Sequence, residues 1–205
     1  MKRTLVIVSA GLRLPSSTRM LADRIADTVR TELEVLGDEV ELEFVEVRSH
    51  AHDLVNHLLT GQPSTELASV FDTIARSDGL ITVTPTFTAS YNGLFKMFFD
   101  SLDDQALVDK PVLIAATGGT GRHSLVLDHA LRPMFTYLHS VVIPTGIFAA
   151  PEDWGGGDDS QASLMSRIAR AGGELAREVH RRDAPVIEDP YADPVTPFSE
   201  MLLGE

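Results

Sequence analysis

The chain contains no cysteine and few basic residues. The lack of cysteine excludes disulfides, thiolate catalysis and cysteine-ligated metal sites, so redox activity would need a cofactor to carry the electrons. Lysine and arginine together number 17 against 30 aspartates and glutamates, which gives a net charge of −13. This acidity disfavours general binding to nucleic acid or to an anionic membrane, because a phosphate surface needs a basic partner.

Long hydrophobic runs are also missing. No apolar stretch approaches the roughly 18 residues that a membrane span needs, and the apolar run after Met1-Lys2-Arg3 is too short for a signal peptide. The sequence therefore predicts a cytoplasmic protein without a membrane segment. At 205 residues the chain is long enough for one domain with a sizeable core, which we expect over residues 1–182.

Residues 183–205 differ in character from the rest. They hold four prolines and six acidic residues but no lysine or arginine. Such a segment cannot form a core of its own, so we interpret it as an acidic, proline-rich tail. Its last apolar residues are expected either to dock on a neighbouring subunit or partner, or to be disordered. These residues are Phe198, Met201, Leu202 and Leu203.

A polar loop over residues 9–19 follows the first apolar run, residues 5–8. The segment after the loop carries apolar residues about every four positions, from Leu21 to Leu36, and is predicted to be an amphipathic helix. Free amides at a helix start, with hydroxyls and arginines nearby, suit a phosphate group. The candidate residues are Ser9, Arg13, Ser16, Ser17, Thr18 and Arg19. The simpler interpretation, that Ser16 or Ser17 only caps the helix, stays open.

Five β-rich runs alternate with helical patterns along the chain. They cover residues 5–8, 40–47, 80–83, 112–116 and 141–149, and the last is expected to break near Pro144. This alternation predicts an α/β fold, a flavodoxin-like three-layer sandwich with a doubly wound, five-stranded parallel sheet in the order 2-1-3-4-5. The loops after the first, third and fourth strands would then meet at one crevice, where open α/β sheets bind ligands.

A histidine-rich segment over residues 50–57 offers a second candidate site. Asp53 and His57 would share a helix face, which permits a metal site. No H-E-x-x-H pattern accompanies them, so the polar face of a short helix is the preferred interpretation, and no metal is predicted.

Three stretches together resemble the NAD(P)H-dependent FMN reductase family of flavodoxin-like proteins. They are SAGLRLPSSTRMLAD (9–23), TPTFTASYNGLFKMFFD (84–100) and ATGGTGRHSLVLDHALRPMFTYL (116–138). The middle stretch is similar to the family pattern T-P-x-Y-x-x-S-x-x-G-x-x-K-x-x-x-D, except that Phe87 stands where the family usually has tyrosine. Within this family, the sequence more specifically resembles the flavin reductases that are paired with luciferase-like monooxygenases.

The resemblance implies a position for each part of FMN. The phosphate would lie among Ser9, Arg13, Ser16, Ser17 and Thr18. The isoalloxazine would be bordered by Pro85, Thr86, Phe87 and Thr88, and its pyrimidine end by Thr117, Gly118 and Gly119. His123 would lie near the ring or the incoming nicotinamide, the one residue with a possible catalytic role.

The resemblance also implies hydride transfer from NADPH or NADH to FMN, in a homodimer that supplies reduced flavin to a partner monooxygenase. The sequence leaves three alternatives open. The first is a quinone or azo-dye reductase that keeps FMN bound, and the second is a non-catalytic FMN-binding electron carrier. The third is a phosphosugar- or nucleotide-binding protein that takes no flavin.

Overall fold

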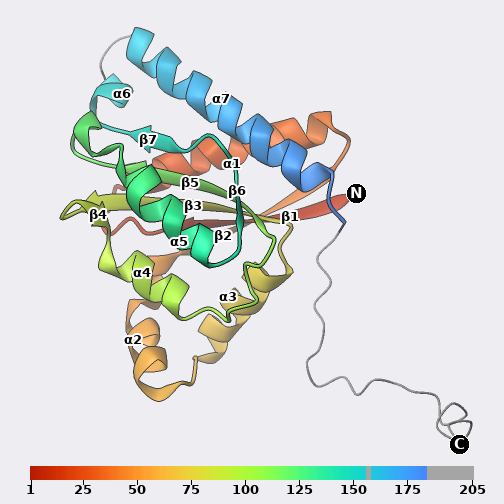
Figure 1. Cartoon of the computed structure of the whole chain (residues 1–205), viewed down its shortest axis with the longest axis vertical. Helices are drawn as coiled ribbons and strands as arrows, with labels where there is room; N and C mark the ends of the chain where they lie inside the picture. Colours follow the sequence, from red (N-terminus) through yellow and green to blue (C-terminus); the bar gives the residue numbers. More distant parts are fainter. Residues whose placement is uncertain (156–157, 184–205) are drawn as a thin grey trace, which may run out of the picture.

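A parallel β-sheet forms the centre of the molecule in the computed structural model, which describes residues 1–155 and 158–183 (Figure 1). Five strands follow one another across the sheet in the order β2-β1-β3-β5-β6. They are β1 (Lys2–Ser9), β2 (Glu39–Glu46), β3 (Gly79–Phe87), β5 (Pro111–Thr117) and β6 (Val141–Val142). The short strand β4 (Ser90–Tyr91) turns back antiparallel to β3, and β7 (Ile147–Ala149) lies parallel to β5.

This topology confirms the predicted sheet order 2-1-3-4-5, once the hairpin strand β4 is set aside. The predicted break in the last strand is also confirmed, since β6 and β7 are separated around Pro144. Strand β2 lies at the edge of the sheet, and its glutamates are mostly exposed, as their alternation with apolar residues predicts.

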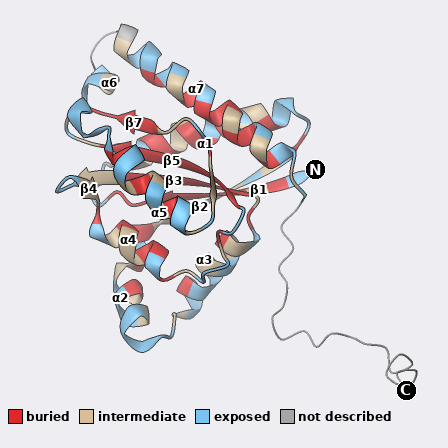
Figure 2. Cartoon of the chain, viewed as in Figure 1, coloured by how far each residue is buried: buried red, intermediate tan, exposed pale blue. Residues whose placement is uncertain are grey.

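Helices cover both faces of the sheet. Helices α1 (Ser17–Val35) and α7 (Asp158–His180) pack on one face. The other face carries α2 (Ala51–Thr60), α3 (Thr65–Arg76), α4 (Gly93–Asp100) and α5 (Arg132–Tyr137). Figure 2 shows the buried residues concentrated in the sheet and on the helix sides that face it.

Periodicity in the sequence explains this burial. In β1, Leu5 and Ile7 belong to the core beneath α1 and α7, whereas Val6 and Val8 belong to the opposite core. A strand in the middle of a parallel sheet is buried on both faces, so its apolar run is continuous. The predicted four-residue spacing places Leu21 through Leu33 of α1 in the core, whereas Leu36 falls beyond the helix and is exposed.

The helix after β5 is interrupted, as Pro133 predicts. A π-helical turn spans Leu127–Leu131, and α5 starts directly after it with the proline in its first turn.

The histidine-rich segment forms a short 3₁₀ turn, Val47–His50, followed by α2. Asp53 there accepts a hydrogen bond from Ser64 at 2.8 Å, and His57 contacts the carbonyl of Ser101, so both contribute to packing around the helix.

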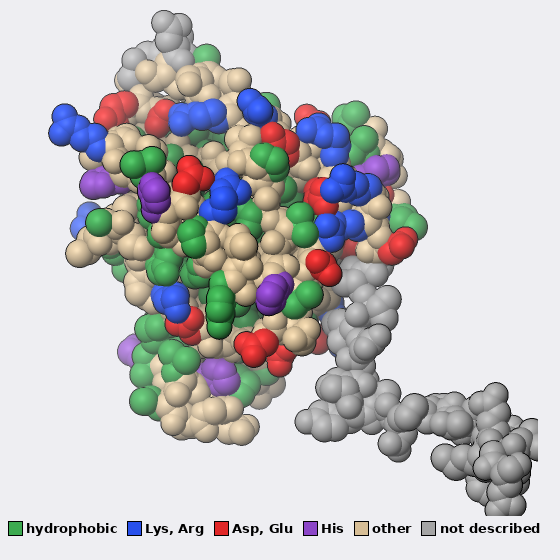
Figure 3. Space-filling view, viewed as in Figure 1, with side chains coloured by type: hydrophobic (Ala, Val, Ile, Leu, Met, Phe, Trp, Pro, Cys, Tyr) green, Lys and Arg blue, Asp and Glu red, His purple; other side chains and the backbone are tan. Residues whose placement is uncertain are grey.

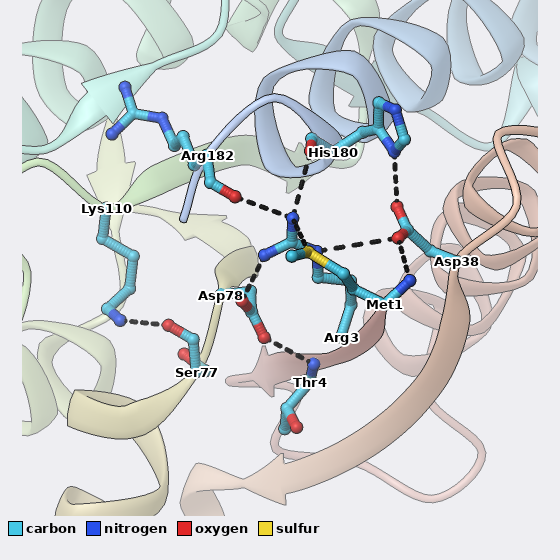
Figure 4. A network of polar contacts seen from close by, with 9 residues as sticks. All are labelled: Met1, Arg3, Thr4, Asp38, Ser77, Asp78, Lys110, His180 and Arg182. Carbon is cyan, nitrogen blue, oxygen red and sulfur yellow. Dashed lines mark hydrogen bonds and ion pairs between the residues drawn. The ribbon is translucent and has the colours of Figure 1, made fainter. Parts of the chain in front are cut away.

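A polar clamp joins four elements at the amino ends of the strands (Figure 4). Arg3 is 1% exposed and donates to Asp78 and to the carbonyls of His180 and Arg182 at the end of α7. Asp38 accepts from His180 Nδ1 at 2.7 Å. We call Arg3, Asp38, Asp78 and His180 the clamp. It ties α7 to the amino ends of the strands, opposite the loops that are predicted to bind ligand.

The predicted tail lies almost wholly outside the described residues, as does the docking expected of its apolar end. Among the described helices, none combines the length and the apolar character needed to cross a membrane.

Candidate functional site

A cavity of about 570 Å³ opens at the carboxyl ends of β1, β3 and β5. This is the predicted meeting point of three loops, and we call it the main cavity. Its lining comes from the loop before α1, the end of β3, the loop after β5 and one residue after β7. These residues are Gly11, Leu12, Arg13, Pro15, Ser16, Ser17, Thr18, Met20, Pro85, Thr86, Phe87, Thr117, Gly118, Gly119 and Pro151.

The start of α1 forms one wall of this cavity. Ser16 caps the helix, because its hydroxyl accepts from the amide of Arg19 at 3.2 Å. The amides of Ser17 and Thr18 have no acceptor among the described residues, and the first turn contains no acidic side chain. Free amides and an uncompensated helix dipole favour an anion at this position.

Two buried threonines connect the start of α1 to the end of β5. The hydroxyls of Thr18 and Thr117 lie 2.9 Å apart and are hydrogen-bonded. This contact fixes the start of α1 relative to the sheet. A further hydroxyl, Oγ1 of Thr86, is buried without a partner among the described residues, although Thr86 lines the cavity. A ligand with polar atoms would satisfy it.

Close approach of neighbouring side chains to the backbone explains two of the glycines. A Cβ at Gly11 would lie 2.1 Å from Oγ of Ser16, and one at Gly118 would lie 2.7 Å from Cζ of Phe148. Any larger residue would push either loop into its neighbour. These positions therefore set the shape of the cavity as well as its lining.

A strained hairpin stands beside the cavity. Thr88 and Ala89 connect β3 to β4, and both have positive φ angles, 47° and 66°. A two-residue turn of this kind normally uses asparagine and glycine, because other residues are strained there. The turn follows Phe87, whose side chain lines the cavity while remaining 46% exposed. Phe87 can thus provide a flat apolar surface at the mouth.

Asn92 is a positioning residue that the sequence analysis did not identify. Its side-chain nitrogen Nδ2 donates to the carbonyl of Ala10 at 2.7 Å, and its Oδ1 accepts from the backbone amide of Phe95 at 2.7 Å. The side chain therefore caps α4 and holds the end of β1. An asparagine before Gly93 and an apolar helix is a capping signal that could have revealed half of this role.

Comparisons with known proteins agree on the family. The family model described as NADPH-dependent FMN reductase matches residues 3–155. The chain is 37% identical over 166 residues to an FMN reductase (NADPH) of Pseudomonas aeruginosa, covering 81% of this chain and 87% of that protein.

The chain belongs to the NADPH-dependent FMN reductase family. A second relative, the NADH-dependent FMN reductase SfnE of Pseudomonas putida, is 35% identical, with 81% and 87% of the two chains covered. Among solved structures, an oxidoreductase from Corynebacterium diphtheriae superposes with a TM-score of 0.86 at 46% identity. That match covers 89% of this chain and 99% of the other.

Most of the residues predicted to contact FMN line the main cavity. Ten of the thirteen lie there: Arg13, Ser16, Ser17, Thr18, Pro85, Thr86, Phe87, Thr117, Gly118 and Gly119. A flat, phosphorylated ligand fits this set, because free amides stand at one end, an unpartnered hydroxyl lies in the wall, and Phe87, Pro85 and the glycines provide apolar or narrow surfaces. Five further residues line the cavity without having been predicted from the sequence: Gly11, Leu12, Pro15, Met20 and Pro151.

Three predicted contacts do not line the main cavity. Ser9 is buried on the strand face of Leu5 and Ile7, beneath α1, and its hydroxyl has no partner in the described part of the chain. Thr88 occupies the hairpin turn. His123 lines a neighbouring cavity of about 400 Å³ with Arg122 and His129, which places it beside the main cavity and not in its wall.

Arg19 is also committed elsewhere. Its guanidinium pairs with Asp23 and Glu46 at 2.7 Å and lies 4.3 Å from the ring centre of Phe44. The charge of this arginine is thus neutralised on the outside of the helix. Arg13 is the only one of the two flanking arginines that lines the main cavity.

Proposed function

We propose that the main cavity holds FMN, with its phosphate at the start of α1, and that the chain catalyses NAD(P)H-dependent reduction of this flavin. The observation that carries the proposal is the pair of free amides of Ser17 and Thr18 at one end of a cavity with flat apolar walls. Membership of the NADPH-dependent FMN reductase family supports the same reaction.

The chain's own task is to bind and orient. Ser17, Thr18 and Arg13 would fix the phosphate, and the Thr18–Thr117 hydrogen bond keeps that end in register with the sheet. Phe87 and the backbone at Gly118 and Gly119 would border the ring. FMN supplies the ring atom that accepts the hydride, so the protein contributes geometry and backbone dipoles instead of a nucleophile.

We leave the reductant as NADPH or NADH, because the two relatives named above differ in this respect. The cavity beside the site carries His123 and the exposed Arg122. We propose that His123 contacts the incoming nicotinamide nucleotide from there. Three relatives at 35% identity are named NADH-dependent FMN reductases, enzymes whose product is reduced flavin, and we propose that a partner monooxygenase uses that product here.

The decisive experiment follows oxidation of NADPH and NADH by the purified chain with added FMN, and separately with a quinone such as menadione. Faster turnover with free FMN supports the proposal and release of reduced flavin. Faster turnover with menadione at a fixed, bound FMN would instead support a quinone reductase. No oxidation above background, with FMN still bound, would contradict the proposal and favour an electron carrier.

We further propose a cytoplasmic homodimer. A groove of about 490 Å³ lies between α4 and the segment around α5, and its lining combines apolar residues such as Phe99 and Met134 with Lys96 and Asp100. Tyr137, which also lines it, is 83% exposed. Figure 3 shows apolar side chains gathered over α4 and α5 on this face. Burial of such a patch by a second copy would stabilise a dimer, which sedimentation of the full chain measures.

A further inference from the structure

A second cavity, of about 390 Å³, adjoins the main cavity. The two share Ser17, Gly118 and Pro151, so they meet at the start of α1 and at the loop after β5. The remaining lining is small and apolar apart from one large ring: Ala149, Ala150, Trp154 and Gly155. Pro85, Thr86 and Phe87, which are proposed to border the flavin ring, do not line this second cavity.

Trp154 is the chain's only tryptophan and it forms one wall of this second cavity. The ring is half-buried against the core beneath α1 and α7. The guanidinium carbon of Arg24 lies 4.9 Å from the ring centre, a cation–π contact from the side of α1. The indole is thus held in place while still contributing surface to a cavity.

The segment that carries Trp154 is braced on both sides. Asp153 accepts from the amide of Ala150 at 2.8 Å and pairs with Arg167 of α7 at 2.6 Å. Arg167 also donates to the carbonyl of Phe148 at 3.1 Å. The short helix α6 (Glu152–Gly155) is thereby fixed to α7 and to the end of β7, so the indole forms a preorganised platform.

We propose that the second cavity binds the adenylate group of a dinucleotide, with the adenine stacked on Trp154 and its phosphate end directed toward the main cavity. This inference rests on the proposed flavin site, which it extends. A purine is flat and largely apolar, so it suits a shallow cavity walled by an indole and small side chains. Ser17 belongs to both cavities, so an adenylate joined to the flavin phosphate would pass from one directly into the other.

Two kinds of dinucleotide, flavin and nicotinamide, carry this group. In FAD the adenylate is attached to the flavin phosphate, and in NADH or NADPH it is attached to the nicotinamide half. The stacking chemistry is the same, and the experiment separates the sources. Loss of one base–aromatic stack lowers affinity by roughly 5- to 150-fold, and we expect about tenfold at this half-exposed wall.

The first test uses the emission of Trp154, which accounts for all tryptophan fluorescence of the chain. Titration with 5′-AMP should change this emission saturably, because adenine contacts the ring. Ribose 5-phosphate offers the same phosphate without a base and should produce no such change. Flavins are avoided as the probe here, since they quench by energy transfer without contact. The absence of any saturable change with 5′-AMP would overturn the proposal.

The second test compares Trp154→Ala with Trp154→Phe in steady-state kinetics. If FAD is the source, the ratio of KM for FAD to KM for FMN rises about tenfold in Trp154→Ala and is restored in Trp154→Phe. If the nicotinamide nucleotide is the source, its KM rises with either flavin. Equal increases in KM for FMN and FAD, with no change for NAD(P)H, would contradict the proposal and assign Trp154 a purely structural role.

Thermal melting of both variants shows whether either is misfolded, and the 5′-AMP titration of the unmutated chain remains decisive in that case. The proposed function fails in a different way, by the absence of NAD(P)H oxidation with FMN. That result would leave the binding of 5′-AMP as a separate measurement.

Discussion

Gly11 shows how a single residue controls the shape of the proposed phosphate end of the main cavity. Any side chain there meets Oγ of Ser16, the atom that caps α1, at 2.1 Å, and Cβ of Thr18 at 3.2 Å. We expect Gly11→Ala to displace Ser16 and to move the free amides of α1. Loss of a well-placed hydrogen bond to a charged group costs about 1.5–3 kcal/mol, or roughly a 10- to 150-fold weaker affinity for FMN. Equilibrium titration with FMN measures it.

Gly93→Ala is the matched control for this substitution. A Cβ at Gly93 meets no atom within 4 Å, and the residue lies at the first position of α4 with no positive φ. Its affinity for FMN should therefore stay within about twofold of the unmutated chain. Equal weakening by both variants would show that the phosphate does not lie against Gly11.

The hairpin between β3 and β4 illustrates strain at the scale of an element. Ala89 has a φ of 66°, a conformation that costs an L-residue about 1–2 kcal/mol and glycine almost nothing. We therefore expect Ala89→Gly to raise the free energy of unfolding by about 1 kcal/mol, measured by urea denaturation. Strain retained next to Phe87 is consistent with a turn selected for the shape of the cavity mouth.

Ala68→Gly tests the same chemical change in an ordinary conformation. Ala68 is an exposed residue inside α3, where glycine costs about 1 kcal/mol relative to alanine. The two substitutions should therefore change stability in opposite directions. Destabilisation by both would mean that Ala89 is not strained.

At the scale of the whole molecule, the clamp stabilises the fold at the end of the sheet opposite the main cavity. Burial alone would raise the pKa of Asp38, but hydrogen bonds from the amino-terminal ammonium and from His180 hold that pKa below its ordinary value. We expect Asp38→Asn to lower the free energy of unfolding at pH 7 by about 1–3 kcal/mol, because the partly exposed amino-terminal ammonium and His180 lose a charged hydrogen-bond acceptor. Affinity for FMN should be retained, since the clamp lies at the opposite edge of the sheet.

The same substitution has a defined pH dependence. A carboxyl with a lowered pKa in the folded state contributes stability that is present above the unfolded pKa of about 3.8 and is lost as the pH falls below it. The stability gap between the unmutated chain and Asp38→Asn should therefore shrink below pH 4, measured by denaturation from pH 7 to pH 3. Asp27→Asn, which removes an exposed ion pair with Arg30, should give almost no gap at any pH. A pH-independent gap would contradict this account.

Much of the site could be predicted because its parts are local in sequence. The hydroxyl-rich loop, the capping serine and the glycines after β5 each have a signature within a few residues, and the sheet order follows from the alternation of strands and helices. Ser9, predicted to lie beside the phosphate, does not line the main cavity, and strand alternation groups it with Leu5 and Ile7 on the covered face. Pro151 and Trp154 could not be found in this way, since they reach the two cavities from α6 and the residue before it, more than 130 residues after Gly11.

The sequence by itself determined the order of strands, the amphipathic helices and the type of loop at each strand end, because periodicity and turn chemistry act over a few neighbouring residues. Only the tertiary structure decided which side chains line the two cavities. Arg19 turns to Glu46 and Phe44, Thr18 meets Thr117, and Trp154 stands beside Ser17, all through contacts between residues far apart in the chain. The direction in which each of these side chains points depends on contacts with residues distant in the sequence, and no local sequence pattern encodes such contacts.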